Sequence, residues 1–196
     1  MDHALRSVFL PAARWIDRAT AAIGRLAAWL VLAACLVSVA NALLRYGAHF
    51  ARPMLLELPI LLFAGIVLGG APRTLAENSH IRVDILYRSL APRRRAMLDI
   101  IGNLIFLMPL CIVMIAEGLP FFGSSWRIGE GSLTPGGIPQ WPAKALIPAA
   151  FALLLLQALS EIVKSISFLR GIEPAPAASG ATSAEEARAL RSSGAP

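Results

Sequence analysis

Charged residues are scarce in this chain. Only 15% of its 196 residues are Asp, Glu, Lys or Arg, whereas 57% are hydrophobic. A typical soluble domain has about 25% charged residues, which keep its surface hydrated. The composition therefore excludes an ordinary soluble fold and indicates that the chain has a lipid bilayer as its solvent.

Cysteine and histidine are also few, and they are dispersed. Cys35 and Cys111 both lie in apolar runs, outside any CxxC motif. His3, His49 and His80 lie in three separate polar segments, a spacing that does not suit metal or haem ligation. The apolar runs also have no carboxylate near their centres. We expect no metal, no cofactor and no catalytic residue, and hence no enzyme.

The net charge of +6 raises the question of a nucleic-acid partner. The arginines, however, cluster beside apolar runs and are not interleaved with aromatic residues on a basic surface. Phospholipid headgroups explain such clusters better. We expect phospholipid as a partner and no nucleic acid.

Long uncharged runs are the main positive feature. Residues 26–44 contain no charge, and about 20 such residues span a hydrocarbon core. Three further runs follow, the last two separated by a Gly- and Pro-rich segment, 117–144, that we expect to be a loop. The sequence predicts a membrane domain over 26–168 with spans at about 26–45, 53–72, 97–116 and 144–163.

The segments outside the spans complete an all-α integral membrane fold. In 1–25, apolar residues recur every three or four positions, which predicts an amphipathic helix in the membrane interface. The basic segment 76–95 predicts a short cytoplasmic loop helix. The composition of 169–196, rich in Pro, Ala, Ser and Gly, predicts a disordered tail.

Charge asymmetry predicts the orientation. Of the 18 Lys and Arg residues, 14 fall within 1–25, 73–95 and 161–196. Short loops rich in Lys and Arg stay in the cytoplasm, so both termini and the basic loop are expected there. The residues expected to contact lipid headgroups and fix the topology are Arg93, Arg94, Arg95, Trp126 and Trp141.

Several residues of the spans are candidates for helix contacts. Gly65 and Gly69 have the GxxxG spacing that lets a second helix approach closely. In the third span, Asn103 shares one helical face with Asp99, Gly102 and Phe106. Arg45 ends the first span and Glu57 opens the second, so they are expected to pair. Whether these contacts are made within the chain or with another subunit stays open.

The basic loop contains a segment of alternating charge. His80 and Asp84 are four residues apart and share a face if the segment is helical. We expect Arg82 and Asp84 to hold the fold of the loop and its contact with a partner protein. The alternative is an ordinary basic loop held by lipid phosphates, in which the number of arginines matters and their positions do not.

The order of these motifs resembles a known family. Arg45-Tyr46 follows the first span, Glu57-Leu58 opens the second, and Leu75-x-x-Asn78-x-His80-Ile-Arg82-Val-Asp84 precedes the arginine cluster. Together with Gly129-Glu-Gly-Ser-Leu-Thr-Pro and Trp141-Pro-x-Lys144, this pattern is similar to the small membrane subunit, the DctQ-like small permease component, of TRAP (tripartite ATP-independent periplasmic) transporters. Met54 and Leu56 stand where many members carry an aromatic and a first acidic residue.

The resemblance implies a small inner-membrane subunit of bacteria that has no transport site of its own. It implies tight association with a large multispan permease, driven by sodium and supplied with organic acids by a periplasmic substrate-binding protein. An autonomous four-span channel or exporter, or an accessory subunit of another membrane complex, is the alternative. Sparse polar residues such as Ser38, Asn41 and Gln157 suit interhelical hydrogen bonds as well as a pore lining.

Overall fold

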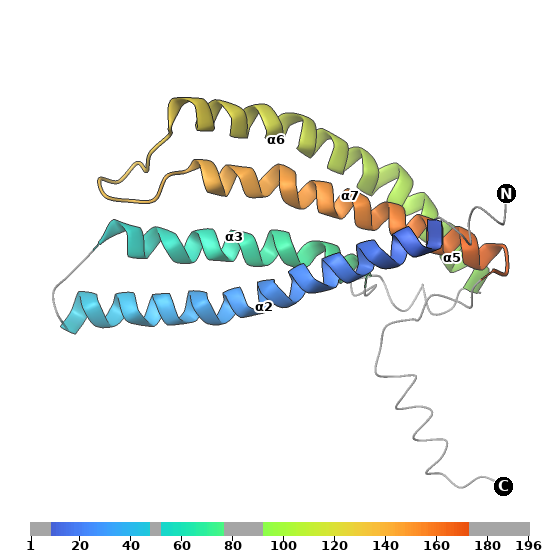
Figure 1. Ribbon diagram of the computed structural model, residues 1–196, viewed down its shortest axis with the longest axis horizontal. Helices are drawn as coiled ribbons and strands as arrows, with labels where there is room; N and C mark the ends of the chain where they lie inside the picture. The colour runs from blue at the N-terminus through green and yellow to red at the C-terminus, as the bar shows by residue number, and fades with distance from the viewer. Residues whose placement is uncertain (1–8, 48–51, 77–91, 173–196) are drawn as a thin grey trace, which may run out of the picture.

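The structure is a computed structural model that describes residues 9–47, 52–76 and 92–172, and helices dominate this part of the chain (Figure 1). Four helical runs within it are long and apolar enough to cross a membrane, as the sequence predicts. They are α2 (Leu10–Gly47), α3 (Pro53–Ala76), the continuous run α5 (Pro92–Gly102), η2 (Asn103–Leu107) and α6 (Met108–Ile128), and α7 (Trp141–Leu169).

Helix α7 is the centre of the bundle. It packs against α2, α3, α5 and α6, and Figure 1 shows it between α6 on one side and the α2–α3 pair on the other. More buried residues of the described part accordingly belong to α7 than to any other helix, among them Gln157, Ala158 and Ser160. The outer helices have few buried side chains, because each has only one or two neighbours.

Helix α2 corrects the boundary expected near residue 25. The expected interfacial helix over 1–25 is not confirmed as a separate element, because α2 continues without interruption from Leu10 to Gly47, and residues 1–8 lie outside the described part. Pro11 does not break this helix because it is the second residue, where an N–H would have no helical partner. The expected loop helix in 76–95 falls largely outside the described residues.

The third span is longer than the sequence indicates. The predicted loop begins at residue 117, but α6 continues to Ile128 and ends at Gly129, which adopts a left-handed conformation with φ of 59°. Glu117 does not end the helix because its side chain is exposed on the helix surface. The π-helical turn η2 ends two residues before Pro109, whose ring clashes with the carbonyl four residues earlier, inside η2, and so favours a wider turn.

The remaining spans also extend past their predicted limits. Helix α3 reaches Ala76 rather than residue 72, and α7 begins at Trp141 rather than 144 and ends at Leu169. Pro148 therefore lies in the third turn of α7, and the helix continues through it. The predicted limits followed charge alone and therefore stopped where each apolar run ends. The helices themselves continue into the polar layer beyond the run.

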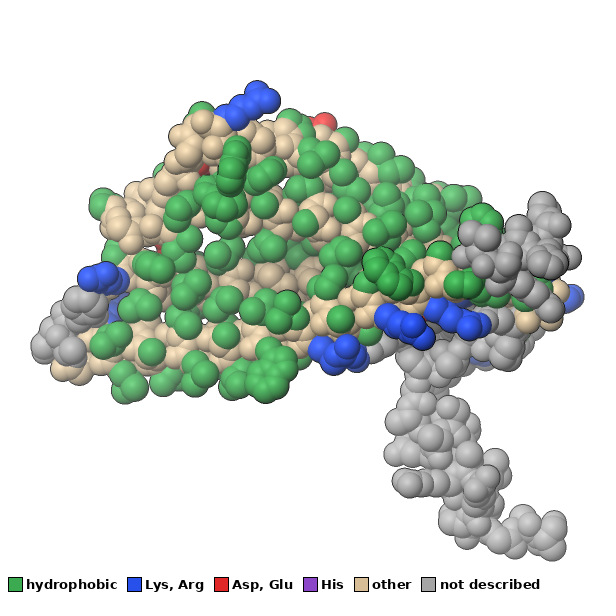
Figure 2. Space-filling view, in the orientation of Figure 1, with side chains coloured by type: hydrophobic (Ala, Val, Ile, Leu, Met, Phe, Trp, Pro, Cys, Tyr) green, Lys and Arg blue, Asp and Glu red, His purple; other side chains and the backbone are tan. Residues whose placement is uncertain are grey.

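Exposed apolar surface covers the long helices. Figure 2 shows hydrophobic side chains over most of the visible face, with Lys and Arg at its left side, at its top and along the lower edge from the centre to the right. Leu43, Ile60 and Phe106 are each at least two-thirds exposed. A surface of this kind requires lipid or another membrane protein to cover it.

Candidate functional site

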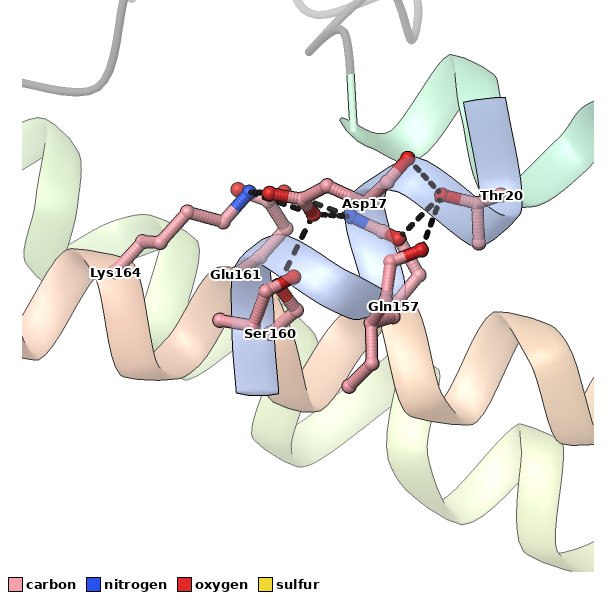
Figure 3. A network of polar contacts seen from close by, with 8 residues as sticks. Asp17, Thr20, Gln157, Ser160, Glu161 and Lys164 are labelled. Carbon is pink, nitrogen blue, oxygen red and sulfur yellow. Dashed lines mark hydrogen bonds and ion pairs between the residues drawn. The ribbon is translucent and has the colours of Figure 1, made fainter. Parts of the chain in front are cut away.

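The most extensive polar cluster of the described residues joins the first half of α2 to the second half of α7 (Figure 3). We call it the Asp17 network. At its centre, Gln157 Nε2 donates to Asp17 Oδ1 at 2.8 Å and to Glu161 Oε1 at 3.1 Å. Gln157 Oε1 accepts a 2.9 Å hydrogen bond from the hydroxyl of Thr20. The fully buried Gln157 amide therefore has partners on both helices.

Lys164 supplies the positive charge of this network. Its ammonium lies 3.1 Å from both carboxylate oxygens of Asp17 and 2.5 Å from Glu161 Oε1. The hydroxyl of Ser160 donates to Asp17 Oδ1 at 3.1 Å. Two carboxylates thus share one ammonium, and the neutral donors Gln157 and Ser160 stabilise the excess negative charge.

The charged side chains of this network are largely shielded from water, so their contacts affect the stability of the bundle. The Glu161 side chain is 8% exposed, and those of Lys164 and Asp17 are 21% and 30% exposed. An ion pair this far from water is costly to break, because removing one member leaves the other desolvated and without its charge partner. The network therefore fixes where α2 crosses α7.

The opposite end of the bundle has a second cluster, centred on Glu57 near the start of α3. Its Oε1 accepts hydrogen bonds from the hydroxyls of Ser132 and Thr134, the second at 2.9 Å. Its Oε2 accepts a 2.7 Å hydrogen bond from the backbone N–H of Ile138. We call residues 129–140 the Glu57 loop, because this carboxylate holds it against α3.

Glycine makes this contact possible. A Cβ at Gly137 would lie 2.5 Å from both carboxylate oxygens of Glu57, so no larger residue fits without displacing the carboxylate. The preceding Gly136 has φ of 82°, a left-handed conformation that side chains disfavour. The sequence Gly136-Gly137 therefore serves the turn and the close approach of Glu57 together.

An ion pair ties the two ends of the Glu57 loop to each other. Lys144, in the first turn of α7, pairs with Glu130, and its ammonium also lies 4.3 Å from the ring centroid of Phe121 on α6. The hydrogen bond from Lys144 lowers the pKa of Glu130 below its ordinary value. The ammonium thereby joins the loop to α6 and α7.

The glycines of the GxxxG motif face α2. A Cβ at Gly65 would lie 3.4 Å from Leu30, and one at Gly69 would lie 3.6 Å from Ile23. The motif therefore packs α3 against the chain's own first span, the alternative that the sequence left open. No atom lies within 4 Å of a Cβ placed at the neighbouring Gly70.

The expected pair of Arg45 and Glu57 is absent from the described contacts. The guanidinium of Arg45 instead lies 5.7 Å from the ring centroid of Tyr46. The Glu57 carboxylate accepts from the Glu57 loop, a segment about 75 positions later in the chain, as the Ser132 contact shows. Arg45 and Glu57 were expected to pair because they lie at neighbouring ends of two spans. This criterion does not consider a loop that comes much later in the chain.

The other sequence candidates are dispersed. Trp126 and Trp141 contact each other edge to face with ring centroids 4.6 Å apart, at the Glu57 end of the bundle. Asn103 begins the π-helical turn, and Arg93 and Arg94 are exposed on α5. Arg95 is also on α5 and is partly buried.

The residues His80, Arg82 and Asp84 of the basic loop lie outside the described residues. Within the described ranges, no three His, Cys, Asp or Glu side chains are grouped to hold a metal ion.

Comparison with known families gives a match over most of the membrane domain. The family described as "Tripartite ATP-independent periplasmic transporters, DctQ component" matches residues 34–168. The chain belongs to this family. The matched region contains the Glu57 loop, Gly65, Gly69 and the α7 half of the Asp17 network, whereas Asp17 itself precedes it. No curated protein and no solved structure matches the chain.

Membership makes this DctQ component a small subunit of a TRAP transporter, and thus a component of a transporter rather than a member of an enzyme family. It also implies the two other parts of a tripartite system, a large permease and a substrate-binding protein.

Sequence reasoning missed the Asp17 network because it treated Glu161 and Lys164 only as the end of a span. The polar spacing of Gln157, Ser160, Glu161 and Lys164 on one helical face was the available signal.

Proposed function

We propose that this DctQ component is the small membrane subunit of a sodium-driven, binding-protein-dependent transporter for organic acids. It acts as a fixed scaffold and partner of the large permease and has no transport site of its own. The observation that carries the proposal is the family match over most of the membrane domain. The substrate class and the sodium gradient follow from the sequence resemblance.

The distribution of charge and apolar surface supports a scaffold. Lys164 forms ion pairs with Glu161 on its own helix and with Asp17 on α2, so these charges join two helices rather than line a path. Large apolar side chains of α2, α3 and α6 remain exposed, including Leu43, Ile60 and Phe106. A neighbouring permease would cover part of this surface, and lipid would cover the rest.

The proposed location is the inner membrane, with both termini in the cytoplasm and the Glu57 loop in the periplasm. The positive charge at the end opposite this loop supports that orientation. Leu133, 95% exposed in the Glu57 loop, provides a site for a test. In a variant without Cys35 and Cys111, Leu133→Cys should react with a membrane-impermeant maleimide from the periplasmic side, whereas Ala178→Cys should react only after the membrane is permeabilised. The reverse pattern would refute the orientation.

Reconstitution tests the function itself. The subunit, its permease and the binding protein would be assembled in liposomes, and uptake of a panel of labelled organic acids would be measured with and without a sodium gradient. We expect uptake only with all components and an inward gradient. Uptake by permease and binding protein at an unchanged rate without this subunit would contradict the scaffold role.

The alternative is an autonomous small channel or exporter, which the polar residues Ser38, Asn41 and Gln157 left open. In the structure, Ser38 bonds to the carbonyl of Ala34 in its own helix, and Gln157 belongs to the Asp17 network. These contacts favour a structural role for both side chains. Solute flux in liposomes containing this subunit alone would support the channel and contradict the scaffold.

A further inference from the structure

Glu117 is a carboxylate on the surface of the third span. Its side chain is exposed on α6, and no hydrogen bond or ion pair to it occurs within the described ranges 9–47, 52–76 and 92–172. By contrast, Glu57, Glu130 and Glu161 each accept a hydrogen bond from another residue. Among the described glutamates, Glu117 is thus left without a partner on this chain.

The packing of α6 on α7 shows how deep Glu117 lies. A Cβ at the neighbouring Gly118 would be 3.3 Å from Cδ of Pro148 on α7. Pro148 is four residues after Lys144, which corresponds to about 6 Å along the helix. Lys144 is the last charged residue before the uncharged run 145–160. Glu117 therefore lies beside the apolar run of α7, deeper than the polar contacts of the Glu57 loop.

The Glu117 side chain also leans away from the nearer membrane surface. Trp126, expected at the level of the headgroups, is nine residues further along α6, or about 13.5 Å of helix. The polar layer on each side of a hydrocarbon core is roughly 5–8 Å thick. Helical side chains lean toward the helix N-terminus, which for α6 is the direction of the middle of the third span. The carboxylate is therefore poorly placed to reach water at the Trp126 end.

The rest of this face of α6 is apolar. Leu110, Val113 and Phe121 lie one or two turns from Glu117 on the same face, and each is about half exposed. Acyl chains would cover these three side chains, but they offer a carboxylate neither a hydrogen-bond donor nor a positive charge. A membrane helix with a cationic side chain at the right level satisfies both requirements.

We infer that this face of α6 is the contact surface for a transmembrane helix of the large permease, and that an Arg or Lys side chain of that helix pairs with Glu117. The inference rests on the proposed function and names the surface through which the subunit joins its partner. Ionisable residues within spans face protein rather than lipid and pair with one another. One such pair would set the level at which the two helices meet.

The test measures binding of the purified full-length subunit to its purified permease in detergent. Glu117→Leu should raise the dissociation constant at least about tenfold, because the permease cation loses its partner in an apolar interface. The same variant without the permease should melt at a temperature no lower than that of the wild type. A lower melting temperature together with unchanged binding would assign Glu117 to the subunit's own fold and overturn the inference.

Leu119→Ala is the matched control. Leu119 lies at nearly the same depth on the other side of α6 and is also about half exposed. Its substitution should leave the dissociation constant within about twofold of the wild type. Equal losses of binding in the two variants would overturn the inference, because the position of the carboxylate would then not matter. If the wild type itself does not bind the permease, the proposed function fails as well, whereas tight binding by Glu117→Leu refutes this inference alone.

Photocrosslinking identifies what covers the face. With the photoreactive residue p-benzoylphenylalanine in place of Glu117, illumination of membranes that contain both subunits should give an adduct with the permease, recognised by mass spectrometry. Adducts only with phospholipid, or only with a second copy of this subunit, would overturn the inference. The crosslinked permease peptide should lie within a few residues of an Arg or Lys, and a peptide far from any such residue would refute the ion pair.

Discussion

Gln157 and Asp17 are 140 positions apart in the sequence, and the amide of the first donates a 2.8 Å hydrogen bond to the carboxylate of the second. This contact connects the first and last described helices of the chain. The same amide donates to Glu161 and accepts from Thr20. A polar contact between the first and last described helices therefore closes the bundle, and apolar packing alone would not specify this contact.

Removing the cation of this network should destabilise the bundle. Lys164→Met leaves Asp17 and Glu161 without their shared ammonium. We expect a loss of about 1–3 kcal/mol in unfolding free energy, less than for a wholly buried pair because the Lys164 side chain is 21% exposed. Thermal or denaturant unfolding in detergent measures the loss.

A second substitution checks the physical reason. In Lys164→Met/Glu161→Met, the carboxylate with least access to water is also removed, so part of the lost stability should return. Ser38→Ala, which removes an exposed hydroxyl bonded within its own helix, serves as a neutral control. A double variant less stable than Lys164→Met would show that charge balance does not govern this network.

Side-chain volume at Gly69 should oppose the packing of α3 on α2. A Cβ fits there at 3.6 Å from Ile23, but the longer side chain of Gly69→Leu would enter α2, at a cost of about 1–3 kcal/mol. Gly70→Leu is the matched control, since nothing lies within 4 Å of a Cβ at that position. Equal melting temperatures for the two variants would show that the Gly69 face is not packed.

The Glu57 loop should depend on Gly137. Gly137→Ala places a methyl group against the Glu57 carboxylate and should break its bonds to the loop, whereas Gly131→Ala meets no atom within 4 Å. We expect a lower melting temperature and faster cleavage of the loop by added protease for the first variant only. Similar cleavage rates in both variants would contradict the role assigned to Glu57.

The ion pair of Glu130 and Lys144 should make stability depend on pH. Because the hydrogen bond from Lys144 lowers the pKa of Glu130 in the folded state, the unfolded chain binds this proton more readily. The stabilisation is therefore present above the ordinary glutamate pKa of about 4.3 and is lost as pH falls through the lower folded value.

Melting temperatures of the wild type and Glu130→Gln, measured between pH 7 and pH 3, test this dependence. The wild type should be the more stable at pH 7, and the difference should shrink below about pH 4. A difference that stays constant over this range would mean that the Glu130 charge does not contribute. Leu133→Ala, a change at an exposed position in the same loop, should leave the pH dependence unaltered.

The sequence by itself determined the membrane class and the four spans. Both follow from local composition, since about 20 consecutive uncharged residues cannot remain in water and suffice to cross a bilayer. Gly65 and Gly69 were expected at a helix contact, because a missing side chain permits close approach whatever the partner, and in the structure they face α2. The segment containing His80, Arg82 and Asp84 lies outside the described residues, and its role stays a prediction.

Only the tertiary structure decided which polar groups meet. Glu57 was assigned to Arg45 by proximity along the chain, but a loop that returns to it from the third span occupies its oxygens. The helix ends and the Asp17 network were missed for a related reason. Hydropathy measures the cost of placing a residue in lipid, whereas a partly buried charge such as Asp17 is retained where distant residues provide its hydrogen bonds, and that depends on how the helices cross.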